Sequence, residues 1–258
     1  MTTAAAPPPG GLTPAGAAHA LYLARRDGRR VPSALLQPAS RGEAYAIQDA
    51  TLAAIGPVGG WKVSALAPGH EPTCAPLPAE GLLPDGARLQ GPAWRLRGIE
   101  AEIGFQLGTD LPPRAAPYTL ADLARAVESV LPVIEIVETR LADWFGADAH
   151  AQLADLLSHG ALVLGRRQPF APAWFDLRRA EAALHFDGQT VAHTVGEHPS
   201  PDAGALLVWL ANHCAARGAG LKAGQIVTSG SCTGMLFASA GTAVRVEIGE
   251  LATVVVSF

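Results

Sequence analysis

The sequence predicts an α+β fold, in which a short helical section precedes a rolled or barrel-like core of mixed β-strands. Two capped helix patterns occupy the chain before residue 57, and from Trp61 onward short β-type runs are interrupted by Gly and Pro. These runs do not alternate regularly with helices, which argues against a doubly wound parallel sheet. Hydrophobic residues make up 49% of the 258 residues, which is ample for a large core.

Two helices are expected first. Thr13 can cap a helix with Pro14 in its first turn, and Gly28 ends it. The stretch Ser40–Glu43 is a capping box that begins a second helix, and this helix runs to Gly56.

The residues before these helices are rich in Ala, Pro and Gly and offer almost nothing to bury, so disorder is expected there. The chain is therefore predicted to divide into a disordered N-terminus (1–12), an N-terminal helical section (13–58) and a β-rich catalytic domain (59–258).

Later elements follow from local signals. A helix is predicted from Thr119 to Val130, after which Pro132 turns the chain into a strand. Asp187–Gly188 is a strong hairpin signal, and Asp202 can cap a further helix. The predicted strands are GWKVSA (60–65), GIEAEIGF (98–105), PVIEIVETR (132–140), ALVLG (161–165), EAALHF (181–186), QTVAHT (189–194), QIVTSGS (225–231), TAVRVEI (242–248) and LATVVVSF (251–258).

Composition narrows the classes of partner. The formal net charge is -4, and the 19 Lys and Arg are scattered, so no nucleic-acid partner is expected. The apolar runs are far too short for a membrane span, and no membrane partner or export signal is expected. Three cysteines without CxxC spacing suggest neither a disulfide framework nor a zinc site, which favours a reducing cytoplasm.

Two acids alternate with apolar residues inside GIEAEIGF. Strand periodicity puts Glu100 and Glu102 on one face and the apolar residues on the other. A solvated outer face would explain this pattern. Two carboxylates held close together repel each other, however, and a cation would offset that repulsion.

A third acid, Glu135, lies between isoleucines in a segment too apolar for a solvent face. Glu138 and Arg140 fall on the opposite face, where they could neutralise each other, whereas Glu135 has no cationic neighbour at strand spacing. Together with Glu100 and Glu102 it offers three hard oxygen ligands that suit Mg²⁺ or Mn²⁺, although structural ion pairs also place acids in strands.

Stretches along nearly the whole chain from Glu43 resemble the fumarylacetoacetate hydrolase superfamily, and within it the branch of 2-keto-4-pentenoate hydratases and 4-oxalocrotonate decarboxylases. They include GWKVS, GIEAEIGF, VLPVIEIVETR, SHGALVLG and QIVTSGSCTG. The resemblance implies the superfamily's rolled β core, a homo-oligomer, and Mg²⁺ or Mn²⁺ held by Glu100, Glu102 and Glu135. It also implies a metal-dependent lyase that acts on a 2-hydroxydienoate or 2-oxo acid through a stabilised enolate.

The resemblance assigns further roles. Lys62 and Ser158 match active-site positions of the family, and the Thr228–Ser231 turn matches a loop that approaches the substrate carboxylate. Thr228, Gly230 and Ser231 are therefore expected to bind substrate, with the glycine letting backbone N–H groups reach an anion. Without the resemblance, Lys62 would be interpreted as a surface lysine whose stem packs on apolar neighbours. Ser158 would be an ordinary loop or cap hydroxyl, and the Thr228–Ser231 stretch an ordinary turn.

Two positions depart from the family pattern. Ala79 stands where hydratases usually carry an acid, and Leu156 stands where the family usually carries an asparagine. These departures leave open a 4-oxalocrotonate-type decarboxylase, an acylpyruvate hydrolase or a non-catalytic member of the family, and they suggest a less polar substrate than the simple dienoate.

Overall fold

The computed structural model describes residues 11–65 and 70–258. The predicted disorder of residues 1–12 lies outside the described residues except at its end, where the Leu12 backbone N–H donates to the Leu35 carbonyl at 2.8 Å. Within the described ranges, no helix is both long enough and apolar enough to cross a membrane. The three-part division of the chain stays a prediction.

The N-terminal helices form where the sequence predicts them. Helix α1 spans Pro14–Asp27, with the Thr13 side chain accepting a hydrogen bond from the Gly16 N–H and Gly28 in the left-handed conformation. Helix α2 spans Arg41–Ile55, with the Ser40 hydroxyl accepting from the Glu43 N–H. The capping box is modified, because the Glu43 carboxylate accepts from the Ala39 N–H instead of that of Ser40.

Within the described residues, the larger sheet has nine strands. Its main path runs β2-β1-β11-β5-β6-β7-β3, with β12 pairing to β5 and β8 to β6. The sheet is mixed, because β1–β11 and β3–β7 are parallel pairs and the other pairs are antiparallel. The strands are β1 (Val58–Ser64), β2 (Thr73–Pro78), β3 (Leu82–Pro84), β5 (Gly98–Leu107), β6 (Val127–Val137), β7 (His159–Leu164), β8 (Gln168–Pro169), β11 (Ile226–Ser231) and β12 (Leu236–Phe237).

The smaller sheet has the order β10-β9-β13-β14-β4. The predicted hairpin joins β9 to β10 through Asp187 and Gly188, which both have positive φ. Its strands are β4 (Ala87–Arg88), β9 (Glu181–Phe186), β10 (Gln189–Val195), β13 (Ala243–Ile248) and β14 (Val254–Ser257).

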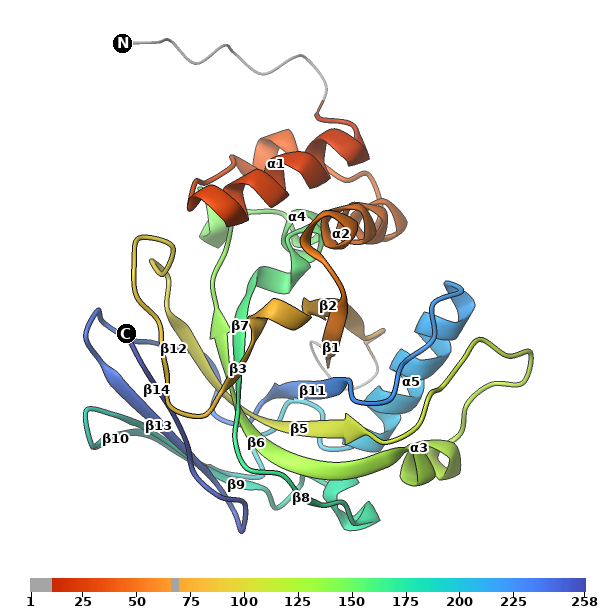
Figure 1. Cartoon of the computed structure of the whole chain (residues 1–258), viewed down its shortest axis with the longest axis vertical. Coiled ribbons are helices and arrows are strands. Elements are labelled where there is room, and N and C mark those ends of the chain that lie inside the picture. The colour runs from red at the N-terminus through yellow and green to blue at the C-terminus, as the bar shows by residue number, and fades with distance from the viewer. Residues whose placement is uncertain (1–10, 66–69) are drawn as a thin grey trace.

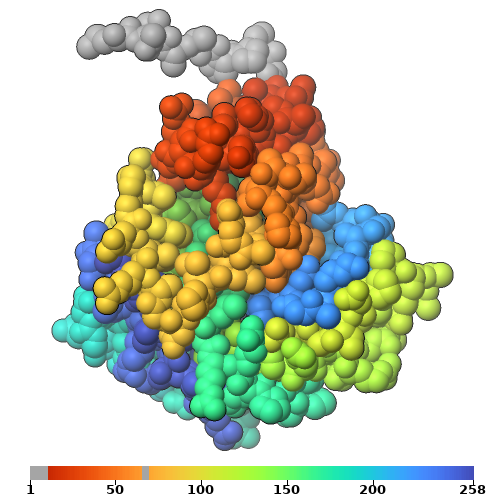
Figure 2. Space-filling model, in the orientation of Figure 1, coloured from red at the N-terminus to blue at the C-terminus, as the bar shows by residue number. Residues whose placement is uncertain are grey.

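The two sheets and the helices surround a common core. Strands β13 and β14 pack against β6, so residues of β5 and β6 are buried on both faces. Figure 1 shows α1, α2 and α4 grouped at one end of the larger sheet, and Figure 2 shows the N-terminal helices as a cap on that end. The remaining helices are α3 (Leu120–Ala126), α4 (Ala149–Ala154) and α5 (Ala203–Ala216), with 3-10 turns η1 (Ser33–Leu35), η2 (Ala79–Gly81), η3 (Trp144–Gly146), η4 (Leu156–Ser158) and η5 (Pro172–Phe175).

The predicted helix from Thr119 to Val130 is too long. Thr119 and Asp122 form the expected cap, but α3 ends at Ala126 and the valines that follow open β6. Pro132 does not turn the chain either, since it lies inside β6 opposite Ile103. Residues 129–130 of β6 pair with β8, and residues 133–137 pair with β7. Pro132 lies between these two segments, so neither strand needs a hydrogen bond from its missing N–H.

Gly60 sets the distance between β1 and β11. A Cβ atom at this position would lie 2.3 Å from the Ile226 carbonyl oxygen of the paired strand. We expect Gly60→Ala to lower the free energy of unfolding by about 1–3 kcal/mol, because the strands would have to separate. Thermal unfolding checks this against Gly146→Ala, whose added Cβ would meet no atom within 4 Å. Equal melting temperatures for the two variants would contradict the expectation.

Candidate metal centre

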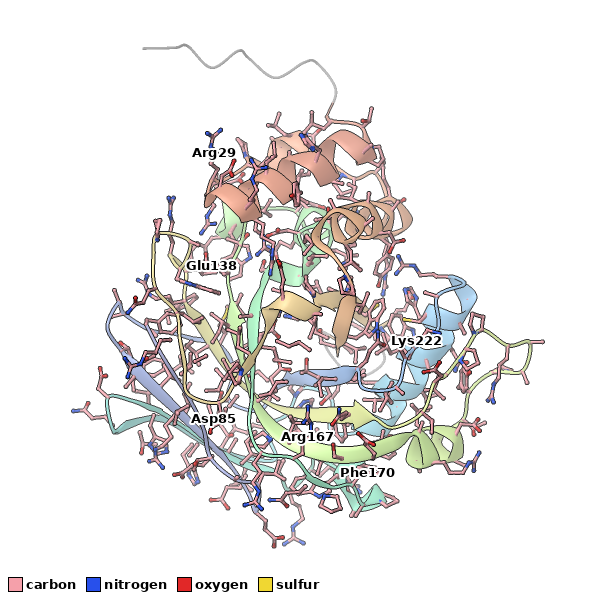
Figure 3. The ribbon with its side chains drawn as sticks, in the orientation of Figure 1. Arg29, Asp85, Glu138, Arg167, Phe170 and Lys222 are labelled. Carbon is pink, nitrogen blue, oxygen red and sulfur yellow. The ribbon has the colours of Figure 1, made fainter. Side chains whose placement is uncertain are left out.

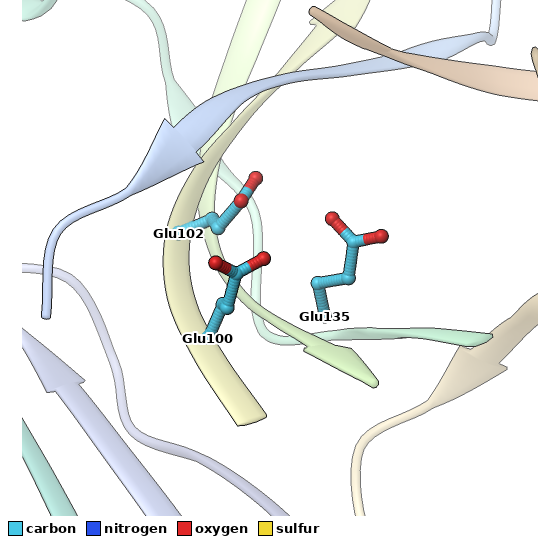
Figure 4. Close-up of side chains that lie close together, drawn as sticks. All are labelled: Glu100, Glu102 and Glu135. Carbon is cyan, nitrogen blue, oxygen red and sulfur yellow. The ribbon is translucent and has the colours of Figure 1, made fainter. Parts of the chain in front are cut away.

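Three glutamates converge on one point of the larger sheet. Glu100 and Glu102 project from β5, and Glu135, on neighbouring β6, is the direct cross-strand partner of Glu100. One carboxylate oxygen from each residue lies within 4.8 Å of the others, and Figure 4 shows the three side chains pointing toward a common space. Glu102 is 2% exposed and Glu135 is fully buried, so a solvated outer face does not explain the alternating pattern.

The oxygens of this glutamate cluster (Glu100, Glu102 and Glu135) are suited to a divalent cation. Oε2 of Glu102 and Oε2 of Glu135 are buried without a hydrogen-bond partner among the described residues. Buried carboxylate oxygens left unpaired are costly, and hard oxygen donors are the ligands that Mg²⁺ and related ions prefer. The donor set therefore fits a hard divalent metal ion.

Protonation within the cluster is uneven. Burial raises the pKa of Glu100 to about 7, and burial also raises the pKa of Glu102 well above its ordinary value. Burial acts in the same direction on Glu135, but the Lys62 ammonium and a hydrogen bond from His159 outweigh it and hold the pKa of Glu135 below its ordinary value. Burial thus shifts two of the three acids toward the protonated form, and a bound divalent cation would oppose that shift.

Lys62 reaches Glu135 from β1, across the sheet. Its Nζ donates to Oε1 of Glu135 at 2.6 Å and to the Leu157 carbonyl at 3.3 Å. Glu135 has no cationic neighbour at strand spacing, but the inference that it is unpaired is wrong, because Lys62 reaches it from a strand separated from β6 by β11 and β5. Burial lowers the pKa of Lys62, but the three glutamates outweigh it, so the pKa is raised and the ammonium stays charged.

His159 also contacts Glu135, and sequence reasoning assigned it no role. Its Nδ1 lies 3.3 Å from Oε1 of Glu135, and the ring is fully buried. Burial lowers the pKa of His159 to about 4, so the ring is neutral and Nδ1–H donates to the carboxylate. The sequence feature that could have indicated His159 is the stretch SHGALVLG, in which this histidine follows Ser158.

Ser158 lies beside the cluster but faces elsewhere. Its Oγ accepts a hydrogen bond from Trp144 Nε1 at 2.8 Å, and the side chain is not part of the pocket wall. Leu156, Leu157 and Ser158 have φ values of 52°, 50° and 58°, three successive left-handed residues that are unfavourable without glycine. This turn presents the Leu157 carbonyl to Lys62.

The predicted substrate-binding turn lies on β11. Thr228 pairs with Lys62 on one side and Gly104 on the other, and its buried hydroxyl lacks a hydrogen-bond partner in the described chain. Gly230 has a φ of 107°, a conformation that glycine permits. Ser231 is the cross-strand partner of Glu102.

A pocket of about 490 Å³ opens over the cluster. Of the predicted residues, it is lined by Lys62, Glu100, Glu102, Gly230 and Ser231, whereas Glu135, Thr228 and Ser158 do not line it. The full lining is Lys62, Val63, Ser64, Ala65, Glu100, Glu102, Leu157, Glu197, Pro199, Gly230, Ser231 and Gly234.

Glu138 and Arg140 do not neutralise each other as predicted. Glu138 accepts from Arg30 at 2.5 Å and from backbone N–H groups of residues 95–97, and Figure 3 shows it below α1 at the edge of the helical section. Arg140 donates to Asp155 at 2.5 Å. Among the described residues, neither Glu138 nor Asp155 has a buried carboxylate oxygen without a hydrogen-bond partner, whereas Glu102 and Glu135 each have one.

The two departures from the family pattern lie away from this pocket. Ala79 is an exposed residue of η2, and Leu156 is buried, but neither side chain lines the pocket wall. The two departures therefore do not support the expectation of a less polar substrate, and the leucine that lines the pocket is Leu157.

Comparison with known proteins places the chain in a family. The family described as fumarylacetoacetate (FAA) hydrolase C-terminal matches residues 45–257. A 2-hydroxyhexa-2,4-dienoate hydratase of Comamonas testosteroni is 33% identical over 159 residues, 62% of this chain and 59% of the relative. A 2-keto-4-pentenoate hydratase of Paraburkholderia xenovorans is 32% identical over 160 residues, 62% of this chain and 58% of the relative. Each match thus spans less than two thirds of the relative's length.

A solved structure shares the fold over most of the chain. The 4-oxalocrotonate decarboxylase from Pseudomonas putida G7, complexed with magnesium and adipate, superposes with a TM-score of 0.82 at 21% identity, covering 95% of this chain and 97% of that one. The expected rolled, mixed β core with an N-terminal helical section is confirmed. From the family match over residues 45–257, the chain belongs to the fumarylacetoacetate hydrolase family.

Proposed function

We propose that this protein is a Mg²⁺- or Mn²⁺-dependent hydro-lyase of the 2-keto-4-pentenoate hydratase type, acting on a 2-hydroxydienoate or 2-oxo acid. The observation that carries the proposal is the buried glutamate cluster with Lys62 at the base of an open pocket. The hydratases among the relatives support the reaction class.

Glu100, Glu102 and Glu135 would hold the metal ion. When bound, the ion would supply a Lewis acid for the carboxylate and 2-oxygen of the substrate, stabilising charge on the enolate. Lys62, charged and fixed by Glu135 and the Leu157 carbonyl, would steer the substrate carboxylate or move a proton. Gly230 and Ser231, which line the pocket, would border the bound carboxylate. Thr228 and Ser158 do not line it and would instead help to position β11 and the Leu157 turn.

Decarboxylation is the second candidate, because the same enolate stabilisation would accept the electrons left by departing CO₂, and the fold neighbour is a decarboxylase. Acylpyruvate hydrolysis needs a histidine-glutamate pair to activate water. His198 lies next to Glu197, but its Nε2 donates to the Gly230 carbonyl and its Nδ1 accepts from the Ser200 N–H. Both ring nitrogens of His198 are thus occupied. The other histidine-glutamate contact of the site, His159 with Glu135, uses the acid that we assign to the metal and that Lys62 already holds, which disfavours this variant.

We further propose that the protein is a cytoplasmic homo-oligomer. A non-catalytic member of the family would have no reason to keep two buried acids, a half-buried acid and a half-buried lysine together, since such a cluster is costly without a ligand.

Metal affinity should depend on pH. Because the pKa of Glu100 is raised to about 7, metal must displace a proton below that pH, and affinity should fall up to about tenfold per pH unit per displaced proton. The stability of metal-free protein should show the opposite trend, falling as pH rises from about 4.5 through 7, because the folded state holds a proton that the unfolded state releases. Mn²⁺ titrations and thermal unfolding between pH 5 and 8.5 check both trends; flat profiles would contradict them.

A substrate screen tests the function. Purified protein with Mg²⁺ or Mn²⁺ is incubated with 2-hydroxypenta-2,4-dienoate, a 4-oxalocrotonate-type acid and an acylpyruvate, and the products are identified. Hydration of a dienoate supports the proposal. Release of CO₂ alone would favour the decarboxylase, and cleavage of the acylpyruvate alone would favour the hydrolase.

A further inference from the structure

The charges around the pocket are strongly unequal. Among the residues that the structure describes, four charged side chains line it, namely Lys62, Glu100, Glu102 and Glu197. Lys62 is the single cation of this set, and its ammonium is already engaged by Glu135 and the Leu157 carbonyl. Residues 66–69, which follow the lining residue Ala65, read Leu-Ala-Pro-Gly and bring no charged side chain.

A bound divalent ion would not provide a binding site for a second carboxylate of the substrate. The three carboxylates of the glutamate cluster, the Lys62 ammonium and a divalent cation together carry no net charge. The first carboxylate of a 2-oxo acid would bind at the metal. No further positive group of the described lining remains for a carboxylate at the other end of the substrate.

Glu197 adds a negative charge at the pocket. Its side chain is exposed, and no hydrogen bond or ion pair to it occurs in the described part of the chain. The next residue, His198, is buried and bonded to the Gly230 carbonyl and the Ser200 N–H, which holds this segment against the pocket. Glu197 therefore presents an unpaired carboxylate at the pocket wall, where it would repel a second anionic group of a substrate.

The rest of the lining suits a hydrocarbon chain. Val63, Ala65, Leu157 and Pro199 contribute apolar surface. The serines of the lining are neutral, and the Ser231 hydroxyl donates to the Gly234 carbonyl at 2.9 Å.

We propose that this pocket selects 2-oxo acids with a single carboxylate and an uncharged tail, and that Glu197 excludes acids with a second, distal carboxylate. This inference rests on the proposed function, because it assumes that the oxo-acid end of the substrate binds at the glutamate cluster.

Binding of two acids of equal length tests the selection. Calorimetry with Mg²⁺-saturated protein compares 2-oxohexanoate with 2-oxohexanedioate, which differ only in a terminal methyl group or carboxylate. The expected result is at least tenfold tighter binding of the monoacid. Glu197→Lys should narrow this ratio several-fold by improving diacid binding, whereas Glu250→Lys, the same charge change in the turn between β13 and β14, should leave the ratio unchanged.

The outcomes separate this inference from the function itself. Equal affinities, tighter diacid binding, or no binding of either acid would overturn the inference. A ratio that Glu197→Lys does not alter would overturn the role of Glu197. If the monoacid binds preferentially while no dienoate is turned over, the selection stands and the proposed lyase reaction fails.

Discussion

Glu102→Gln is expected to abolish metal-dependent turnover while the protein remains folded. The substitution keeps the size of a side chain that is 2% exposed but removes one of three anionic ligands. Loss of a direct ligand should weaken Mg²⁺ or Mn²⁺ binding by more than the roughly 10–100-fold typical of supporting residues around metal sites. Metal titration and turnover measured on the same preparation check this expectation.

The same variant should be more stable than the wild type when metal is absent. Burial raises the pKa of Glu102, so folding of the wild-type protein at high pH requires this carboxyl either to take up a proton or to stay ionised while buried. Both cost folding free energy, and glutamine avoids that cost because it does not ionise. The stabilisation should therefore be larger at pH 8 than at pH 5. Glu250→Gln, at an exposed turn, is the matched control and should change neither property. Full metal-dependent turnover in folded Glu102→Gln would remove Glu102 from the metal site.

Lys62→Ala is expected to reduce turnover by more than tenfold, equivalent to over about 1.4 kcal/mol of transition-state stabilisation, while metal still binds. The variant also leaves Glu135 fully buried without its ammonium partner. Removing one member of a buried ion pair costs on the order of 3–5 kcal/mol, so the metal-free variant should unfold at a lower temperature, and saturating metal should recover part of the loss.

Two further variants separate the roles of Lys62. Lys62→Ala combined with Glu135→Gln should recover stability, because no unpaired charge remains; only its stability is compared, since Glu135 is also assigned to the metal. Lys222→Ala removes an exposed lysine, labelled in Figure 3, that lies 3.5 Å from Asp110, and should affect neither property. Near-normal rates in Lys62→Ala would show that the ammonium serves the fold and not the reaction.

The convergence of the three glutamates could be predicted because it depends on short-range rules. Strand periodicity puts Glu100 and Glu102 on one face, and β5 and β6 are neighbouring antiparallel strands, so Glu135 needed only the correct register to meet them. The helix caps at Thr13, Ser40 and Thr119 were predictable for the same reason, because each depends on groups within a few residues.

The contacts that complete the site depend on sheet order, which the sequence does not specify locally. Lys62 contacts Glu135 from β1, and the sheet order places β11 and β5 between β1 and β6. His159 contacts Glu135 from β7, the neighbour of β6 on the other side. The left-handed turn at Leu157, which presents a carbonyl to Lys62, occurs in non-glycine residues that carry no turn signal. Glu197 reaches the pocket from a segment after β10 that no local motif marks.

Metal binding by the glutamate cluster can be measured directly with Mn²⁺. Mn²⁺ is titrated at pH 8 into metal-stripped wild-type protein and into Glu102→Gln, with bound and free ion distinguished by electron paramagnetic resonance. We predict one bound ion per chain in the wild type, displaced by Mg²⁺, and no comparable binding in the variant. Absence of specific Mn²⁺ binding to the wild type, or equal binding by both proteins, would contradict metal binding by this cluster.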